Sequence, residues 1–188
     1  MKLSTKVKIF LKRMRGDYSG NTDLEKLKKM GLSVGENFNM QSGCIIDPNH
    51  CFLITIGDNV TLGSRVHILA HDGSTSKHLG CTKIGLVEIG DNTFIGTETT
   101  ILPNIKIGKN VIVGANSLVS KDIPDNCVYA GNPARFICTL EEYIEKQKML
   151  IDEKPVFERK YRIEKNMTQE MKEEMINKLK EARHGFLK

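Results

Sequence analysis

The sequence contains no tryptophan, and only 6% of its 188 residues are aromatic. A core built on large rings is therefore not expected, and repeated aliphatic side chains must fill the interior instead. No run of residues approaches the roughly 20 apolar positions of a membrane span, and the N-terminus lacks the apolar stretch and cleavage site of a signal peptide. These absences predict a cytoplasmic protein.

Cysteine is sparse and poorly placed for cross-linking. The five cysteines are an odd number, are widely spaced, and include no C-x-x-C pair. This pattern suits neither a disulfide framework nor a structural zinc site. We therefore expect reduced thiols that mostly pack in the interior, as is usual in the cytoplasm.

Positive charge is concentrated at the N-terminus, where residues 1–30 hold nine Lys/Arg against three acids. A nucleic-acid-binding protein usually carries such charge along a groove of the folded body, so no nucleic-acid partner is expected. Residues 1–30 predict a basic amphipathic helical segment, with Val7, Phe10, Leu11 and Met14 on one face. This helix either caps the open end of the fold or, through residues 1–15, contacts an anionic inner-membrane surface.

An internal repeat of six residues dominates the middle of the chain. Aliphatic residues recur at every sixth position and are usually followed by a small residue: Ile89, Ile95, Ile101, Ile107, Val113 and Val119. The same register appears upstream from Ile56 to Ile68 and, further back, from Val34 to Ile46.

A period of six fits neither a helix at 3.6 residues nor a plain strand at 2. It fits a short strand followed by a turn. Three such units close a triangular coil of eighteen residues, and successive coils stack at about the spacing of neighbouring strands in a sheet. The sequence thus predicts a mainly β protein with a parallel β-helix over residues 31–137. A β-sandwich, the alternative, does not explain six consecutive hexads in register.

Two breaks interrupt this register. Ile46 and Ile56 are ten residues apart, and Ile68 and Ile89 are twenty-one apart. The second break predicts a loop over residues 72–86 that is extruded from a corner of a coil. Functional residues concentrate on loops held by a rigid scaffold, so the breaks are where we look for a site.

After residue 137 the hexads stop, and residues 138–188 predict a helical extension. Thr139 to Glu142 form a capping box that opens a helix running to about Leu150. Thr168 begins a second helix, and Gly185 is expected to end it.

His71 is the leading catalytic candidate, because it is the last residue before the extruded loop. Transfer of an acyl group from a thioester to a hydroxyl needs a base that takes the hydroxyl proton. An imidazole, whose ordinary pKa lies near neutrality, suits this role.

The stretches Val66–Asp72 and Ile89–Thr97 resemble the hexapeptide-repeat acyltransferases, in the branch of the maltose and galactoside O-acetyltransferases. The resemblance is stronger still to the O-acetyltransferases of capsular and cell-surface polysaccharides. It implies a left-handed helix, a homotrimer, and direct acetyl transfer from acetyl-CoA to a sugar or oligosaccharide hydroxyl, with His71 as the general base. It implies no acyl-enzyme and no metal, and the oxyanion would be held by preorganised donors such as backbone N–H groups.

The same resemblance suggests a coenzyme site in a groove between two subunits. Thr97 and Ala115 match the family's hexad corners beside the pantetheine arm, and Ser120 with Lys121 match a Thr-Lys element beside CoA. Arg135 matches the basic residue of the terminal Gly-x-Pro-Ala-Lys/Arg motif, which meets the nucleotide phosphates. Where some relatives carry a second Arg, this chain has Cys138, so we expect its phosphate binding to differ from theirs.

For the acceptor, the resemblance points to Asn37 and Asp47, whose amide and carboxylate groups are suitable partners for sugar hydroxyls. The alternative for the asparagine is purely structural, because Asn readily makes the turns of such a coil.

Other functions stay open at this point. The acceptor could be the amino group of a nucleotide-linked sugar or an antibiotic hydroxyl. A γ-class carbonic anhydrase has the same fold and holds zinc with three histidines, which invites comparison with His50, His67 and His71. A non-catalytic scaffold is a further alternative.

Overall fold

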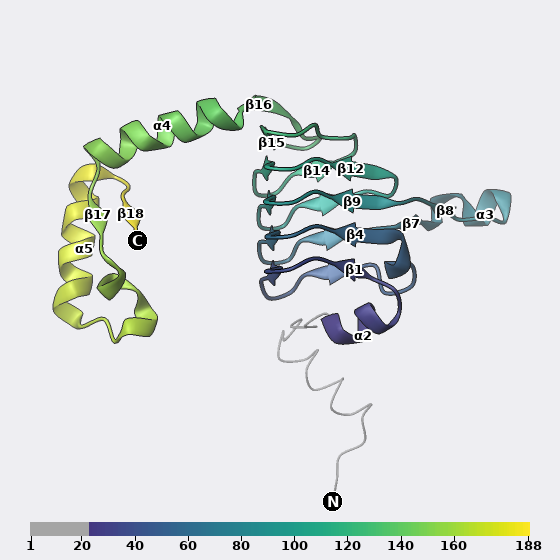
Figure 1. Cartoon of the computed structure of the whole chain (residues 1–188), viewed down its shortest axis with the longest axis horizontal. Helices are drawn as coiled ribbons and strands as arrows, with labels where there is room; N and C mark the ends of the chain where they lie inside the picture. Colours follow the sequence, from purple (N-terminus) through teal and green to yellow (C-terminus); the bar gives the residue numbers. More distant parts are fainter. Residues whose placement is uncertain (1–22) are drawn as a thin grey trace, which may run out of the picture. The chain divides into compact units, whose positions relative to one another are not determined.

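The computed structural model describes residues 23–188, so the expected helix face of Val7 to Met14 and the contact through residues 1–15 lie outside the described residues. The chain divides into two compact units, residues 1–140 and 141–188. The first is a stack of coils, and the second consists of helices and one small sheet (Figure 1). Among the residues the structure describes, none of the helices is both long and apolar enough to cross a membrane.

The repeat folds as predicted into a left-handed parallel β-helix with three sheets. The first sheet contains β1 (Ser33–Val34), β4 (Ile54–Ile56), β9 (Val87–Ile89) and β12 (Ile105–Ile107). The second contains β2 (Asn39–Met40), β5 (Thr61–Leu62), β10 (Phe94–Ile95), β13 (Ile112–Val113), β15 (Cys127–Ala130) and β16 (Arg135–Thr139). The third contains β3 (Ile45–Ile46), β6 (His67–Ile68), β11 (Thr100–Ile101) and β14 (Leu118–Val119).

Each coil visits the three sheets in turn, so it has three corners. We call the turn that follows the first sheet the first corner, the turn that follows the second sheet the second corner, and the turn that follows the third sheet the third corner. Strands of successive coils pair in parallel and in register, for example Ile56 with Ile89 and Ile68 with Ile101. At the end of the stack, β16 pairs antiparallel with β15.

The aliphatic hexad positions form the core, as the period requires. From Ile46 onward they are almost completely buried: Ile46, Ile56, Leu62, Ile68, Ile89, Ile95, Ile101, Ile107, Val113 and Val119. Each contributes about 1.5–3 kcal/mol relative to exposure. Thr93, Thr99 and Ser117 are also buried, and their hydroxyls donate to glycine carbonyls at the corners.

Both breaks in the register are insertions at the third corner. The first holds a short 3-10 helix, η1 (Cys51–Leu53). The second is the predicted loop, and it is an antiparallel hairpin of β7 (His71–Asp72) and β8 (Lys83–Ile84), with η2 (Gly73–Thr75) and α3 (Ser76–Leu79) between them. The hairpin projects from the coils (Figure 1).

The described end of the N-terminal segment covers the first coil. Asp23 caps α2 (Leu24–Lys29) by accepting from the backbone N–H of Lys26. Leu27 of this helix is buried in the same core cluster as Leu32 and Cys51. For residues 24–29, the capping interpretation therefore holds.

The second unit contains α4 (Leu140–Glu153), β17 (Val156–Phe157), η3 (Arg159–Tyr161), η4 (Ile163–Lys165), α5 (Gln169–Ala182) and β18 (Phe186–Leu187). Thr168 caps α5 as predicted, through a hydrogen bond from the N–H of Met171. The predicted end at Gly185 is wrong, because Arg183 takes a left-handed φ of 66° and the helix stops at Ala182. Gly185 instead lets β18 approach β17, since a Cβ there would lie 2.6 Å from the carbonyl oxygen of Pro155.

Candidate active site

The third corner brings together residues that are far apart in the sequence. Asp47 follows β3 and His71 follows β6, and these two strands are parallel neighbours with Ile46 opposite Ile68. The N–H of Asp47 donates to the carbonyl of Ile68 at 2.9 Å. Both insertions thus leave the stack at the same corner of adjacent coils, which places the two side chains side by side.

Asp47 is a buried carboxylate, and both of its oxygens accept hydrogen bonds. Its Oδ1 accepts from the N–H groups of Asn49 at 3.0 Å and His50 at 3.1 Å, and its Oδ2 accepts from the N–H of Ala70 at 3.0 Å. Burial acts to raise the pKa of this carboxyl, but the hydrogen bonds from His71 and from the three backbone groups outweigh burial. The pKa of Asp47 is therefore lowered, and the group is a carboxylate at neutral pH.

His71 completes a carboxylate–imidazole pair. Its Nδ1 makes a short hydrogen bond to Oδ2 of Asp47. An ionised carboxylate accepts only, so Nδ1 carries the proton and Nε2 is left as a hydrogen-bond acceptor. About a third of the His71 side chain is exposed, whereas that of Asp47 is fully buried. The arrangement resembles the carboxylate–histidine pairs of other enzymes, in which the carboxylate holds one tautomer of the imidazole.

The imidazole opens onto a groove of about 780 Å³ at the third corner. The hairpin contributes Asp72, Gly73, Lys83 and Ile84, and the coils contribute Leu69, Leu102, Pro103 and Asn104. The ammonium of Lys83 lies 2.8 Å from Oδ2 of Asp72, and this contact, with hydrogen bonds from Ser74, lowers the pKa of Asp72 to about 2. The groove has the size of a small-molecule site and a mixed polar and apolar lining.

His50 lies beside His71, a placement that the sequence suggested only through the comparison with a zinc site. Its ring centroid lies 4.9 Å from that of His71, and its Nδ1 lies 3.9 Å from Oδ1 of Asp47, too far for a hydrogen bond. This Nδ1 is buried and has no hydrogen-bond partner, and it is the one such side-chain nitrogen or oxygen within residues 23–188. The comparison with a γ-class carbonic anhydrase sets His50 and His71 beside His67. Among the described residues, the cluster of potential metal ligands contains Asp47, His50 and His71 and does not include His67.

The five residues expected to bind coenzyme occupy two corners and the last strand. Thr97 and Ala115 both lie at the second corner in successive coils, where the carbonyl of Thr97 accepts from the N–H of Asn116 at 2.7 Å. Ser120 and Lys121 follow β14 at the third corner, one coil beyond Leu102 of the groove. Arg135 opens β16 and is exposed. One chain therefore places Thr97 and Ala115 at a different corner from His71.

The two residues expected to bind the acceptor, Asn37 and Asp47, lie at different corners of the stack. The carboxylate of Asp47 is fully buried and bonded to His71 and to backbone N–H groups. Asn37 lies at the first corner with a φ of 53°, and its amide donates to Oδ1 of Asn59 at 3.1 Å. Within one chain, Asn37 lies at a different corner from the groove, and its binding of the acceptor stays a prediction.

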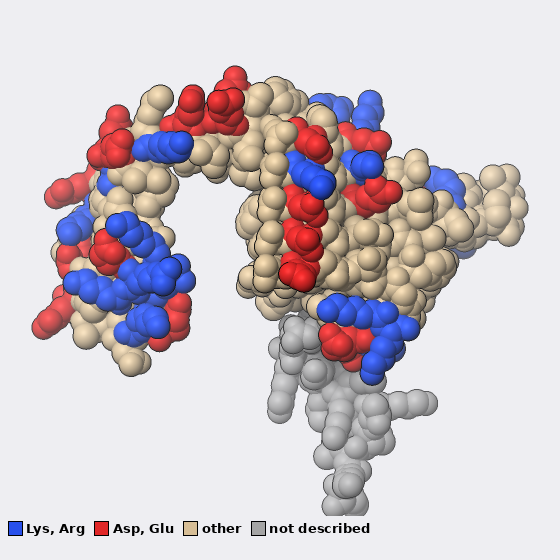
Figure 2. Space-filling model, in the orientation of Figure 1, with Lys and Arg blue, Asp and Glu red and all other residues tan. Residues whose placement is uncertain are grey.

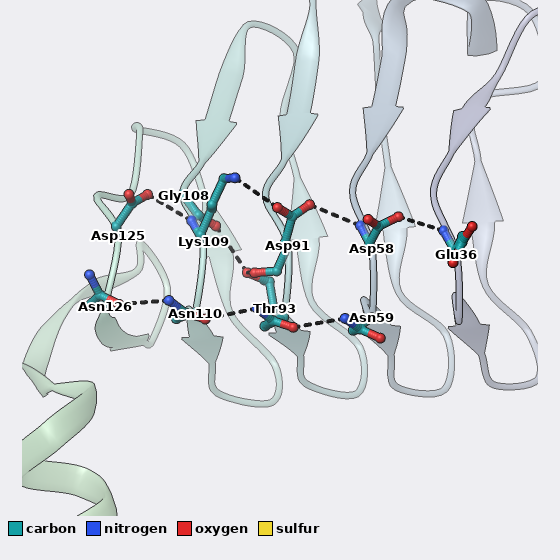
Figure 3. Close-up of polar contacts among 11 residues, drawn as sticks. Glu36, Asp58, Asn59, Asp91, Thr93, Gly108, Lys109, Asn110, Asp125 and Asn126 are labelled. Carbon is teal, nitrogen blue, oxygen red and sulfur yellow. Dashed lines mark hydrogen bonds and ion pairs between the residues drawn. The ribbon is translucent and has the colours of Figure 1, made fainter.

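Asn37 begins a ladder that runs the length of the stack. At the first corner of each coil an asparagine with a left-handed φ donates its amide to the next: Asn37, Asn59, Asn92, Asn110 and Asn126. Figure 3 labels Asn59, Asn110 and Asn126 of this ladder. Beside it, carboxylates accept from the backbone of adjacent coils, and Lys109 pairs with Asp91 at 2.8 Å. Figure 2 shows these acidic side chains as a column along the stack.

Comparison with known proteins agrees with this fold and site. Residues 87–121 match the family described as bacterial transferase hexapeptide (six repeats). Over 186 residues the chain is 35% identical to the protein CapG of Staphylococcus aureus, covering 95% of this chain and 99% of that protein. The chain therefore belongs to the hexapeptide-repeat acetyltransferases.

The solved structures that are similar to this chain include two sugar acetyltransferases. A maltose O-acetyltransferase from Clostridium difficile is 43% identical, with a TM-score of 0.51, over 56% of this chain and 57% of that chain. A galactoside acetyltransferase in complex with coenzyme A is 26% identical, with a TM-score of 0.52, over 77% of this chain and 88% of that chain. The chain spans about half the length of the maltose enzyme and 53% of YvoF of Bacillus subtilis, to which it is 44% identical over 95 residues.

Proposed function

We propose that this protein is an acetyl-CoA-dependent O-acetyltransferase that acetylates a hydroxyl of a sugar or polysaccharide precursor. The observation that carries the proposal is the pair of His71 and buried Asp47 at the edge of a groove of about 780 Å³. The names of the maltose and galactoside enzymes support a sugar acceptor, and the complex of the latter supports CoA as the carrier.

In the proposed reaction, acceptor and acetyl-CoA are bound together. Nε2 of His71 takes the proton of the acceptor hydroxyl while its oxygen attacks the thioester carbonyl. The tetrahedral intermediate then collapses, the C–S bond breaks, and the imidazolium returns its proton to the departing CoA thiolate. No acyl group is attached to the protein at any stage.

Asp47 supports both halves of this cycle. Its hydrogen bond fixes the tautomer in which Nε2 is free to accept, and its charge stabilises the imidazolium that forms. Since three backbone N–H groups hold the carboxylate in place, little reorganisation is needed when the proton moves.

Coenzyme binding is proposed at the interface of a homotrimer. Because His71 and Thr97 lie at different corners, the second corner of one subunit would face the third corner of its neighbour. Thr97 and Ala115 would line the pantetheine arm, Ser120 and Lys121 would lie beside CoA, and Arg135 would meet its phosphates. The basic residues 1–15 and a location at the inner face of the membrane remain predictions.

The acceptor is identified by incubating the protein with acetyl-CoA and a panel of free sugars and nucleotide sugars, and measuring release of free CoA thiol. The proposal expects release only with a hydroxyl acceptor, and a product that contains an alkali-labile acetyl ester. Release only with amino sugars, giving an alkali-stable amide, would contradict O-acetylation.

A further inference from the structure

Three potential metal ligands converge beside the groove. Asp47, His50 and His71 each offer one ligand atom, and these atoms lie within 4.8 Å of one another. They come from two insertions on adjacent coils, so the rigid third corner of the β-helix holds them together. A carboxylate with two imidazoles is a donor set that zinc and similar divalent ions bind.

His50 is the member of this cluster that the proposed acetyl transfer leaves unexplained. Its Nδ1 is buried, has no hydrogen-bond partner, and lies 3.9 Å from Oδ1 of Asp47. A buried nitrogen without a partner is unfavourable, and structures rarely retain one without a reason. Two ligands of a tetrahedral zinc ion lie about 3.4 Å apart, at bonds of about 2.1 Å each. An ion would therefore need a small closure between His50 and Asp47, and it would replace the short hydrogen bond between Nδ1 of His71 and Asp47.

The charges of the cluster also favour a cation. Asp47 is ionised, and unprotonated imidazoles are neutral ligands, so the three side chains supply one negative charge. About a third of each imidazole side chain is exposed, so an ion can enter from the groove side and keep a water ligand there.

We propose that Asp47, His50 and His71 bind one zinc ion per chain, and that this binding reversibly inhibits acetyl transfer. The second half of the proposal rests on the function proposed above for His71. When a metal occupies Nδ1 of a neutral imidazole, the single ring proton resides on Nε2. Nε2 then cannot accept the proton of the acceptor hydroxyl, and Asp47 no longer orients the ring for that purpose.

The site is tested by isothermal titration of the chelator-stripped full-length protein with zinc chloride. We expect the wild-type protein to bind one zinc ion per chain. The His50→Ala and His50→Gln variants should bind zinc at least tenfold more weakly than the wild-type protein, and the His78→Ala variant should bind it equally well. His78 is the matched control, because it lies on α3 of the hairpin outside the cluster. Thermal melting followed by circular dichroism verifies that each variant is folded.

Absence of stoichiometric binding, or equal affinity of the wild-type protein and both folded His50 variants, would overturn the site. This experiment needs no acceptor and is independent of acetyl transfer.

Inhibition is tested by measuring acetyl transfer against zinc concentration, with each variant normalised to its own rate in excess chelator. The midpoint of inhibition should match the zinc affinity, shift at least tenfold in His50→Ala, stay unchanged in His78→Ala, and be reversed by chelator. Full occupancy with an unaltered rate would overturn the inhibitory role. If no acceptor supports transfer, the proposed function fails, while the titration still decides the zinc site.

Discussion

His71 donates through Nδ1 to Oδ2 of Asp47, a carboxylate 24 residues earlier in the sequence and on the preceding coil. The contact joins an exposed imidazole edge to a fully buried anion. Since the coil register fixes both residues, the pair is rigid before any substrate arrives. Its consequences for catalysis and stability can be separated experimentally.

Replacing His71 with Ala should remove the base and leave the coil intact, because the residue lies outside the hexad core. We expect kcat to fall by about 10²- to 10⁴-fold, the usual contribution of general-base catalysis. Binding of CoA, measured by titration, should stay near the wild-type value. Retained turnover would remove His71 from the role of base.

Replacing Asp47 with Asn keeps the shape of the side chain but removes its charge and alters the tautomer preference of His71. We expect kcat to fall at least tenfold, since Nε2 is then no longer the favoured acceptor. If instead Asp47 bound the acceptor, the main effect would be on the KM for the acceptor. Steady-state kinetics that vary the acceptor concentration distinguish the two roles.

The same Asp47→Asn variant should have an altered dependence of stability on pH. The pKa of Asp47 is lowered in the folded protein, so its ionised form stabilises the fold at pH values above the unfolded-state pKa, near 3.8. That contribution is lost as the pH falls from there through the lower folded-state pKa. Denaturant unfolding at pH 7 and at pH 3 should show the wild-type advantage, about 1–3 kcal/mol at pH 7, shrinking in acid. An advantage that grows in acid would contradict this.

The period of six was sufficient to predict the coil, because core positions from Ile46 to Val119 are set by local alternation and size. It also predicted His71 as the last residue before an insertion. The role of Asp47 could not be read in the same way, because it depends on which corners coincide in space. The signal was present: both breaks follow the third strand of a coil. Asp47 and His71, one and three residues after the paired Ile46 and Ile68, are therefore expected to lie near each other.

For Asn37 the resemblance suggests acceptor binding, which stays a prediction. The asparagines that recur at the same corner of successive coils give this residue a structural explanation as well. The hairpin of β7 and β8 was seen only as a loop, because two-residue strands leave no periodicity to detect. The sequence pattern of one chain also does not predict which residues of two subunits would lie side by side.

Replacing both Lys121 and Arg135 with Ala should weaken acetyl-CoA binding. Charge-assisted hydrogen bonds to phosphate contribute about 1.5–3 kcal/mol each, so the KM for acetyl-CoA should rise at least tenfold while kcat changes little. Lys106→Ala is a suitable control, since that ammonium lies on the first sheet and pairs with Glu88 at 3.0 Å. An unchanged KM in the double variant would mean that the phosphates bind elsewhere.

The protein should sediment as a trimer with a mass near three times 21.2 kDa. The reason is geometric, since Thr97 and His71 lie at different corners of one chain and would meet only across the proposed subunit boundary. Sedimentation equilibrium over a range of concentrations measures this directly. A monomer that still transfers acetyl groups would contradict the shared site.

Asn92 is an interior rung of the asparagine ladder, and its replacement should separate backbone strain from hydrogen bonding. Its amide donates to Asn110 at 3.2 Å and accepts from Asn59 at 3.0 Å, with a φ of 56°. Asn92→Ala loses both contacts and keeps an unfavourable left-handed φ, which costs about 1–2 kcal/mol for a residue with a Cβ. Asn92→Gly loses the same contacts but adopts this φ readily. We therefore expect the Ala variant to be less stable than the Gly variant by about 1 kcal/mol in denaturant unfolding. Equal stability of the two would mean that the ladder, and not the turn conformation, is what selects asparagine at this corner.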